Sequence, residues 1–151
     1  MTPRLAWLLA PVLAACTSSS PSTDIDSTPL SGSVGGQPWT IMAGATDPFG
    51  SQDQPDFSAT LSPAAFACND SDPTVPHLFV SIPRQPGDYP MSLSRNMTFV
   101  DSAAHNLIVV DGRIVVDSVT ATTVTGGLVG RYDGSNEVNG RFTLTVCPNQ
   151  P

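Results

Sequence analysis

Histidines are the first residues to consider for chemistry, because an imidazole can act as a general base near neutral pH. His77 and His105 are the only histidines in the chain. A hydrolase triad would need one of them beside a nucleophile and a carboxylate. The chain has no G-x-S-x-G elbow that would present a serine nucleophile. We therefore assign neither histidine a catalytic role and keep an enzyme only as an alternative.

Carboxylates gather in two polar stretches, and oxygen-rich loops of exported β-domains can bind calcium. One stretch reads TDPFGSQDQPDF and the other reads CNDSDP. Neither matches the EF-hand pattern, so we interpret the acids as solvated turn residues and predict no metal and no other cofactor. The alternative is a metal site built from Asp47, Asp53, Asp56, Asp70 and Asp72.

Aromatic side chains could form a platform for a sugar or a peptide, although large aromatics on strands more often lie in the core. The candidates for such a ligand platform are Trp39, Tyr89 and Tyr132. The aromatic residues expected in the core are Trp39, Phe57, Phe79, Tyr89, Phe99 and Phe142.

The start of the chain has the form of a secretion signal. Arg4 supplies one positive charge, and the apolar run from Leu5 to Leu13 is far shorter than the roughly 18 residues that a membrane-spanning helix needs. Two alanines then precede Cys16. An ordinary signal peptide has small residues at both positions that flank the cut, whereas Leu13 is bulky. Residues 13–16, LAAC, instead resemble the lipobox of bacterial lipoproteins.

This resemblance implies that the Cys16 thiol receives a diacylglycerol and that residues 1–15, the signal peptide, are removed. Two or more acyl chains would fasten the protein to a membrane without help from its surface. Residues 16–29 are rich in Ser, Thr and Pro, so we expect a flexible tether followed by a β-rich domain at 30–151. An aspartate after the cysteine would favour inner-membrane retention. Thr17 stands there instead, which favours the outer membrane.

Cys68 and Cys147 remain once Cys16 is lipidated. An even pair of cysteines in an exported chain predicts a disulfide. The alternative is two free thiols or two metal ligands, but two cysteines without neighbouring histidines make a poor zinc site.

The charge of the chain limits its partners. Its formal net charge is -7, from six basic and thirteen acidic residues. Such a chain repels phosphate backbones, which excludes nucleic acid as a partner. The expected partners are the membrane, through the acyl chains on Cys16, and an envelope protein or a glycan.

Short β-rich runs alternate with Gly, Pro, Asn and Asp, which predicts an all-β domain. Its architecture would be an antiparallel β-sandwich or a small open barrel. No long helical stripe occurs, and residues 62–67, SPAAFA, favour one or two helical turns at most. The strands expected upstream are 30–34, 39–45, 57–61, 78–82, 88–93 and 97–100.

Two hairpins are expected downstream. Asp111-Gly112 is the residue pair of a type I′ turn, which would join 106–110 to 113–119. The side chains expected on its core face are Leu107, Val109, Ile114 and Val116. The second hairpin would turn at 134–136, and the glycines inside its strands indicate bulges or strong curvature.

Residues 30–148 resemble small β-rich lipoproteins of myxobacterial type that have no characterised activity. The likeness is carried by SGSVGGQPWTIMAGA, by Cys68, by SIPRQPGDYPMSL and by VNGRFTLTVCP. It implies a fold and a location but no reaction. We therefore expect a lipid-anchored protein of the cell envelope that is a binding or structural module. One alternative is an envelope hydrolase or other enzyme with a loop-built site, made of His77, His105 and the Asp47–Asp56 loop. The other is an adhesin or inhibitor that binds glycan or peptide.

Overall fold

The computed structural model describes residues 24–50, 53–74 and 76–148. The signal segment 1–15, Cys16 and residues 17–23 lie outside the described residues, so their predictions stay predictions. The strands are β1 (Ser31–Val34), β2 (Gln37–Thr40), β3 (Ala43–Thr46), β4 (Asp56–Ser62), β5 (His77–Pro83), β6 (Gly87–Pro90), β7 (Met97–Val100), β8 (Asn106–Val109), β9 (Gly112–Val119), β10 (Thr123–Asp133) and β11 (Asn136–Thr145).

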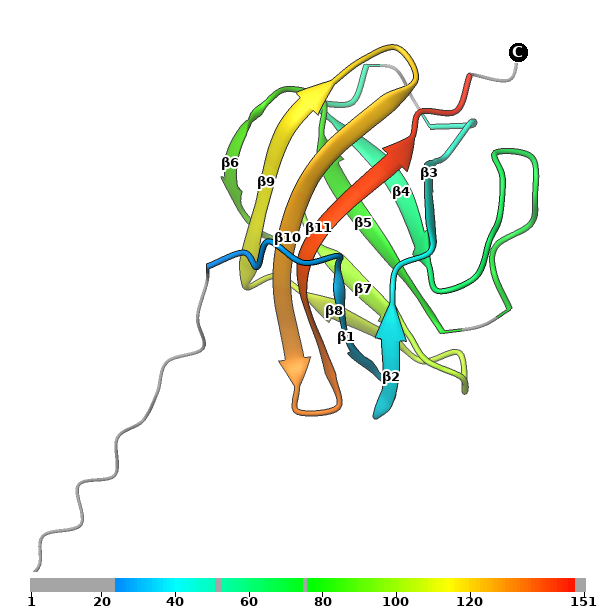
Figure 1. The fold of residues 1–151 in the computed structure, drawn as a ribbon, viewed down its shortest axis with the longest axis vertical. Helices are drawn as coiled ribbons and strands as arrows, with labels where there is room; N and C mark the ends of the chain where they lie inside the picture. The colour runs from blue at the N-terminus through cyan, green and yellow to red at the C-terminus, as the bar shows by residue number, and fades with distance from the viewer. Residues whose placement is uncertain (1–23, 51–52, 75, 149–151) are drawn as a thin grey trace, which may run out of the picture.

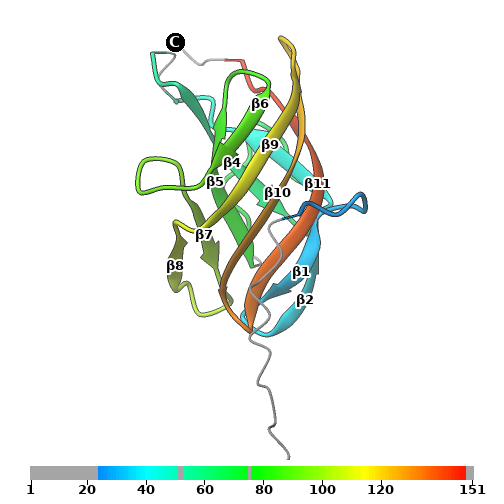
Figure 2. The same ribbon diagram turned by 90° about the vertical axis from the view of Figure 1, so that its left-hand side faces the viewer.

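The strands form one curled, open sheet with the shape of a half-barrel (Figures 1 and 2). Their order is β6-β9-β10-β11-β3-β4-β5-β7-β8, and β1 and β2 attach beside β11. The pairings between strands are antiparallel except that of β11 with β3. The prediction of an all-β domain with an open, barrel-like sheet is confirmed.

The hydrophobic core fills the concave side of this sheet. Leu61, Leu78, Phe99, Ile114 and Leu128 are all fully buried there. Each such side chain stabilises the fold by about 1.5–3 kcal/mol relative to an exposed position. Because side chains alternate along a strand, the residues between them point to the convex side, where ligands could reach them.

Some expectations about the core need correction. Trp39, Phe57, Phe99 and Phe142 are buried as predicted, and Tyr89 packs against the core from a half-buried position. Phe79 does not belong to the core. It alternates with Leu78 and Val80 along β5 and therefore lies on the convex face.

The predicted β8–β9 hairpin is wrong. β8 pairs with β7, whereas β9 pairs with β10 and β6. A type I′ turn needs positive φ at both centres, and Asp111 and Gly112 have none. The expected core face is nevertheless correct, because Val109, Ile114 and Val116 are buried and Leu107 packs against the core.

Two glycines of the β1–β2 hairpin supply the turn that sequence reasoning assigned elsewhere. Gly35 and Gly36 have φ of 59° and 74° and join Val34 to its partner Gln37. These angles fit a two-residue type I′ turn, which suits the right-handed twist of a hairpin. The predicted β10–β11 hairpin is confirmed, with a register shift at Arg131/Asp133. The pairing of β10 with β9 has a second shift at Thr125/Gly126.

Residues 24–29 form a strap across the convex side of β10 and β11. The amide of Arg141 donates to the Thr28 carbonyl at 2.8 Å, and the amide of Asp26 donates to Oδ1 of Asn139 at 3.0 Å. The Ile25 side chain lies over Gly127. Residues 24–29, which the sequence assigns to the tether, are thus hydrogen-bonded to the sheet.

The described residues contain no helix, and residues 62–67, which favoured one or two turns at most, end β4 and continue as bends. Within this part of the chain there is also no apolar helix of a length that would cross a membrane. Residues 63–74 instead form a long segment without helix or strand beside β3–β5 (Figure 1).

Candidate functional site

A pocket of about 430 Å³ lies between the convex face of β3–β5 and the segment 63–74. Ser58 and Thr60 of β4 form part of its floor, because they alternate with the core residues Phe57, Ala59 and Leu61. Its wall comes from Phe66 to Asp70 and Asp72, and its rim comes from the loop after β3. We call this site the convex pocket.

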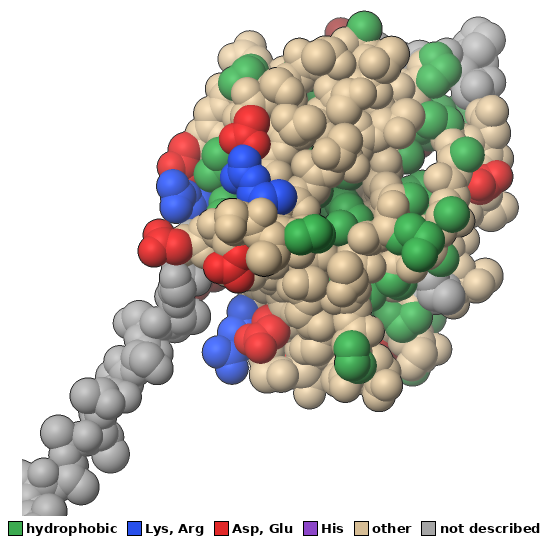
Figure 3. All heavy atoms as spheres, viewed as in Figure 1, with side chains coloured by type: hydrophobic (Ala, Val, Ile, Leu, Met, Phe, Trp, Pro, Cys, Tyr) green, Lys and Arg blue, Asp and Glu red, His purple; other side chains and the backbone are tan. Residues whose placement is uncertain are grey.

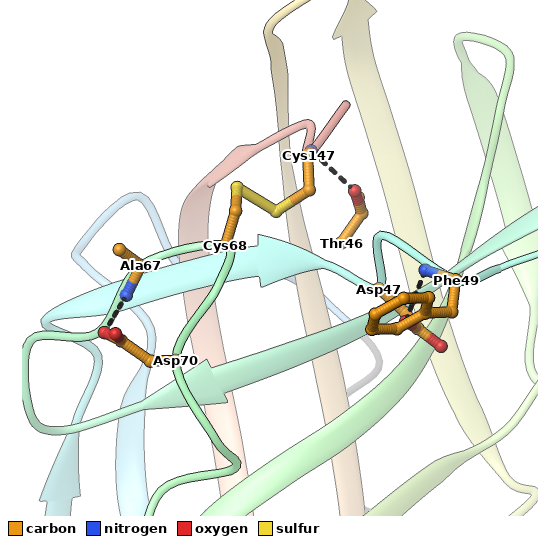
Figure 4. Close-up of a disulfide and its surroundings, with 7 residues drawn as sticks. All are labelled: Thr46, Asp47, Phe49, Ala67, Cys68, Asp70 and Cys147. Carbon is orange, nitrogen blue, oxygen red and sulfur yellow. Dashed lines mark hydrogen bonds between the residues drawn. A yellow bond between two sulfur atoms is a disulfide. The ribbon is translucent and has the colours of Figure 1, made fainter. Parts of the chain in front are cut away.

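A disulfide fixes the wall of the convex pocket. Cys68 is bonded to Cys147, as predicted, with their Cα atoms 5.4 Å apart (Figure 4). Cys147 is buried, and its amide donates to Oγ1 of Thr46 at 2.9 Å, which ties the end of the chain to β3. Beyond the far end of the segment, Nε1 of Trp39 donates to the Pro76 carbonyl at 3.0 Å. The wall is therefore held at both ends.

Three phenylalanines, Phe49, Phe66 and Phe79, line the convex pocket. Phe49 is 79 % exposed, so most of its apolar side chain faces solvent. Its loop is set by Asp47, whose Oδ1 accepts the Phe49 amide at 2.8 Å. Figure 4 shows Asp47 and Phe49 on one side of the disulfide and Ala67 and Asp70 on the other. The rim thus presents an aromatic ring opposite a stapled wall.

Three carboxylates, those of Asp47, Asp70 and Asp72, also line the convex pocket, and no arginine does. Oδ2 of Asp70 accepts the Ala67 amide at 2.7 Å, which shapes the loop next to Cys68. Figure 3 shows a different arrangement over β9–β11, where arginines lie directly beside acids. There Arg113 pairs with Asp88, and its hydrogen bond holds the pKa of that carboxyl below the ordinary value.

The predicted alternative of a calcium site is not assembled by these residues. Asp56 lies outside the convex pocket, and its two oxygens accept hydrogen bonds from Arg95 at 2.9 Å each. Asp53 is not among the residues lining that pocket either. Among residues 24–50, 53–74 and 76–148, no three His, Cys, Asp or Glu side chains gather closely enough to hold a metal ion.

Both histidines have local structural contacts. His77 is 6 % exposed, and its ring meets the ring of Phe79 edge-on at 4.8 Å. Nδ1 of His105 lies 3.0 Å from Oδ2 of Asp101. The other carboxylate oxygen of Asp101, Oδ1, accepts hydrogen bonds from the backbone amides of Ala103 and His105. Hydrogen bonds from His105 hold the pKa of Asp101 below its ordinary value. This carboxylate therefore shapes a turn.

The aromatic platform proposed from the sequence is not formed by its three candidates. Trp39 is 3 % exposed in β2 and uses its indole N–H internally. Tyr89 of β6 donates its hydroxyl to the Gln85 carbonyl, and Arg95 lies 4.8 Å from its ring centre. Tyr132 is 52 % exposed but stands at the far end of β10.

Sequence reasoning missed the aromatic residues that do line a pocket. Phe49 lies inside TDPFGSQDQPDF, a stretch that the sequence analysis considered only for its carboxylates as metal ligands. A phenylalanine between Pro and Gly in a polar loop has no strand to bury it, and that was the available signal. Comparison of the chain with protein-family models, with curated proteins and with solved structures finds no match.

Proposed function

We propose that this protein is a lipid-anchored binding module of the cell envelope and that the convex pocket is its ligand site. The observation that carries the proposal is the exposed ring of Phe49 at the rim of a pocket with a disulfide-held wall. Large exposed apolar side chains beside a concavity are typical of binding sites. A wall fixed before binding also lowers the entropic cost of holding a ligand.

The anchor in this proposal is the lipid on Cys16, which the lipobox-like sequence LAAC supports. The described chain begins at Asp24 on the β9–β11 side of the domain, and the segment 63–74 lies on the opposite side (Figure 1). An anchor at the start of the chain leaves the convex pocket facing away from its own attachment. The proposed location is the outer membrane, with an envelope glycan, protein or small molecule as the partner.

The pocket is tested with Nile red, a neutral dye whose fluorescence rises in apolar sites. The purified full chain should enhance its emission, and Phe49→Ala should weaken the affinity at least threefold, because the largest exposed ring at the rim is lost. Leu93→Ala is the matched control, since Leu93 is 87 % exposed but does not line the convex pocket. Equal affinities for the two variants would reject the pocket as the ligand site.

The anchor is tested separately by metabolic labelling with a palmitate analogue. Wild-type protein should carry the label and stay with the membrane fraction, whereas Cys16→Ser should lose both properties. Cys68→Ser is a control for thiol labelling, because the sulfur of Cys68 is placed in a disulfide. Labelling of Cys16→Ser at the wild-type level would remove the anchor from the proposal.

A further inference from the structure

We infer that the convex pocket selects an organic cation with an apolar body, such as an alkyl or aryl ammonium group. This inference rests on the proposed function and adds the charge class of the ligand. It follows from two independent properties of the lining, which are its three carboxylates and its aromatic rings.

The first property is the sign of the charge. Asp47, Asp70 and Asp72 line the pocket, and neither Arg nor His is among the residues that line it. The chain contains no Lys. Asp47 and Asp70 each use one oxygen for a backbone amide, which leaves the other oxygen of each for a ligand. A phosphate or carboxylate ligand would be repelled here, whereas a cation would be attracted.

The second property is the chemistry of the apolar wall. Phe49, Phe66 and Phe79 line the pocket, and aromatic ring faces attract cations within about 6 Å of the ring centre. The domain already uses this contact elsewhere, since the Arg84 guanidinium lies 4.0 Å from the ring centre of Phe57. An ammonium group bearing an apolar substituent could contact the rings and be attracted by the carboxylates at the same time.

The size of the site fits a small ligand. A volume of about 430 Å³ lies at the lower end of the range for small-molecule pockets. The polar floor of Ser58 and Thr60 can accept a hydrogen bond from an N–H donor. A folded protein partner would need a far larger surface than this one concavity offers.

The test compares three probes of similar size and different charge: benzyltrimethylammonium, benzyl alcohol and phenylacetate. Each is titrated into the purified full chain, and binding is followed by NMR shifts of the amides of residues 45–47, 49 and 66–72. The cation should bind most tightly and the anion least. Raising the salt from 20 mM to 500 mM should weaken the binding of the cation and leave the binding of benzyl alcohol unchanged, because salt screens charge but not apolar contact.

The variant test neutralises one carboxylate while keeping its shape. Asp72→Asn should lower the affinity for benzyltrimethylammonium about three- to tenfold, as expected for the loss of one charge near a surface ligand. The affinity for benzyl alcohol should not change. Asp111→Asn is the matched control, because Asp111 is exposed in the bend before β9 and does not line the pocket, and its replacement removes the same net charge.

Two results separate this inference from the proposed function. The inferred charge selectivity is wrong if benzyl alcohol or phenylacetate binds as tightly as the cation, or if Asp72→Asn and Asp111→Asn bind the cation with equal affinity. The pocket would then remain the proposed ligand site. If Nile red and all three probes fail to shift the pocket amides, the pocket itself is wrong.

Discussion

The strap 24–29 makes a sharp prediction at Gly140. This residue has φ of 139°, and a Cβ there would lie 2.7 Å from the Thr28 carbonyl oxygen and 2.8 Å from Cα of Leu30. Both obstacles are backbone atoms, so they cannot swing aside as a side chain could. In Gly140→Ala, either β11 or the strap must move, and the strap is the weaker of the two because it is held along one side only.

The cost of Gly140→Ala can be added up from its parts. The strap would lose the 2.8 Å hydrogen bonds from the Arg141 amide to Thr28 and from the Leu30 amide to Arg141. Each is worth about 1 kcal/mol. The positive φ adds about 1–3 kcal/mol of strain for a residue with a side chain. The expected loss is about 3–5 kcal/mol, which lowers Tm by roughly 10–15 °C for a domain of this size.

The assay is thermal unfolding of Gly140→Ala beside Gly134→Ala. At Gly134 the nearest atom to an added Cβ is 3.8 Å away, so this control should change stability by less than about 0.5 kcal/mol. Hydrogen exchange should also show faster exchange at the Leu30 and Arg141 amides in the first variant only. If Gly140→Ala has the same Tm as Gly134→Ala and its Leu30 and Arg141 amides stay protected, the close packing of the strap on Gly140 is refuted.

The remaining predictions concern the disulfide and two exposed turns. Replacing Cys68 and Cys147 with serine opens a link across 79 residues and should cost about 4–5 kcal/mol in denaturant titrations, as reductant should in the wild type. Ala104→Gly should stabilise the domain by about 1 kcal/mol in the same titrations, because Ala104 has φ of 59°. The hydrogen bond from the Ser135 amide lowers the pKa of Asp133, so this carboxylate stabilises the fold fully above about pH 4 and less as the pH falls through its folded pKa. The gap in Tm between wild type and Asp133→Asn should therefore narrow from pH 5 to pH 2; a constant gap contradicts the assignment.

The sequence predicted the strands better than their pairing. Alternation placed Val109, Ile114 and Val116 in the core correctly, because burial depends on local pattern. The partner of β8 depends on the whole sheet, and the choice of β7 leaves Asp111-Gly112 outside any tight turn. The turn geometry expected for that pair was built instead by Gly35-Gly36, where the two strands are short and adjacent.

The candidate site was harder to foresee than the fold. The disulfide followed from counting cysteines, but the pocket needs Phe49, Phe66 and Phe79 from three separate segments to meet. Phe79 was expected in the core because it lies in an apolar strand, and only its place in the alternation of β5 turns it outward. Residues 24–29 looked like a tether because their composition is polar, yet backbone hydrogen bonds, which composition does not reveal, hold them on β11.

The strap also sets how far the domain could travel from a bilayer. If lipid sits on Cys16, the predicted tether between the lipid and the sheet is limited to the stretch from Cys16 to Asp24, because the residues after it are hydrogen-bonded to the sheet. At no more than about 3.6 Å per residue, that tether spans under about 30 Å even when stretched. The molecule would then sample a thin layer above the lipid headgroups, and its ligand would have to be found within that layer.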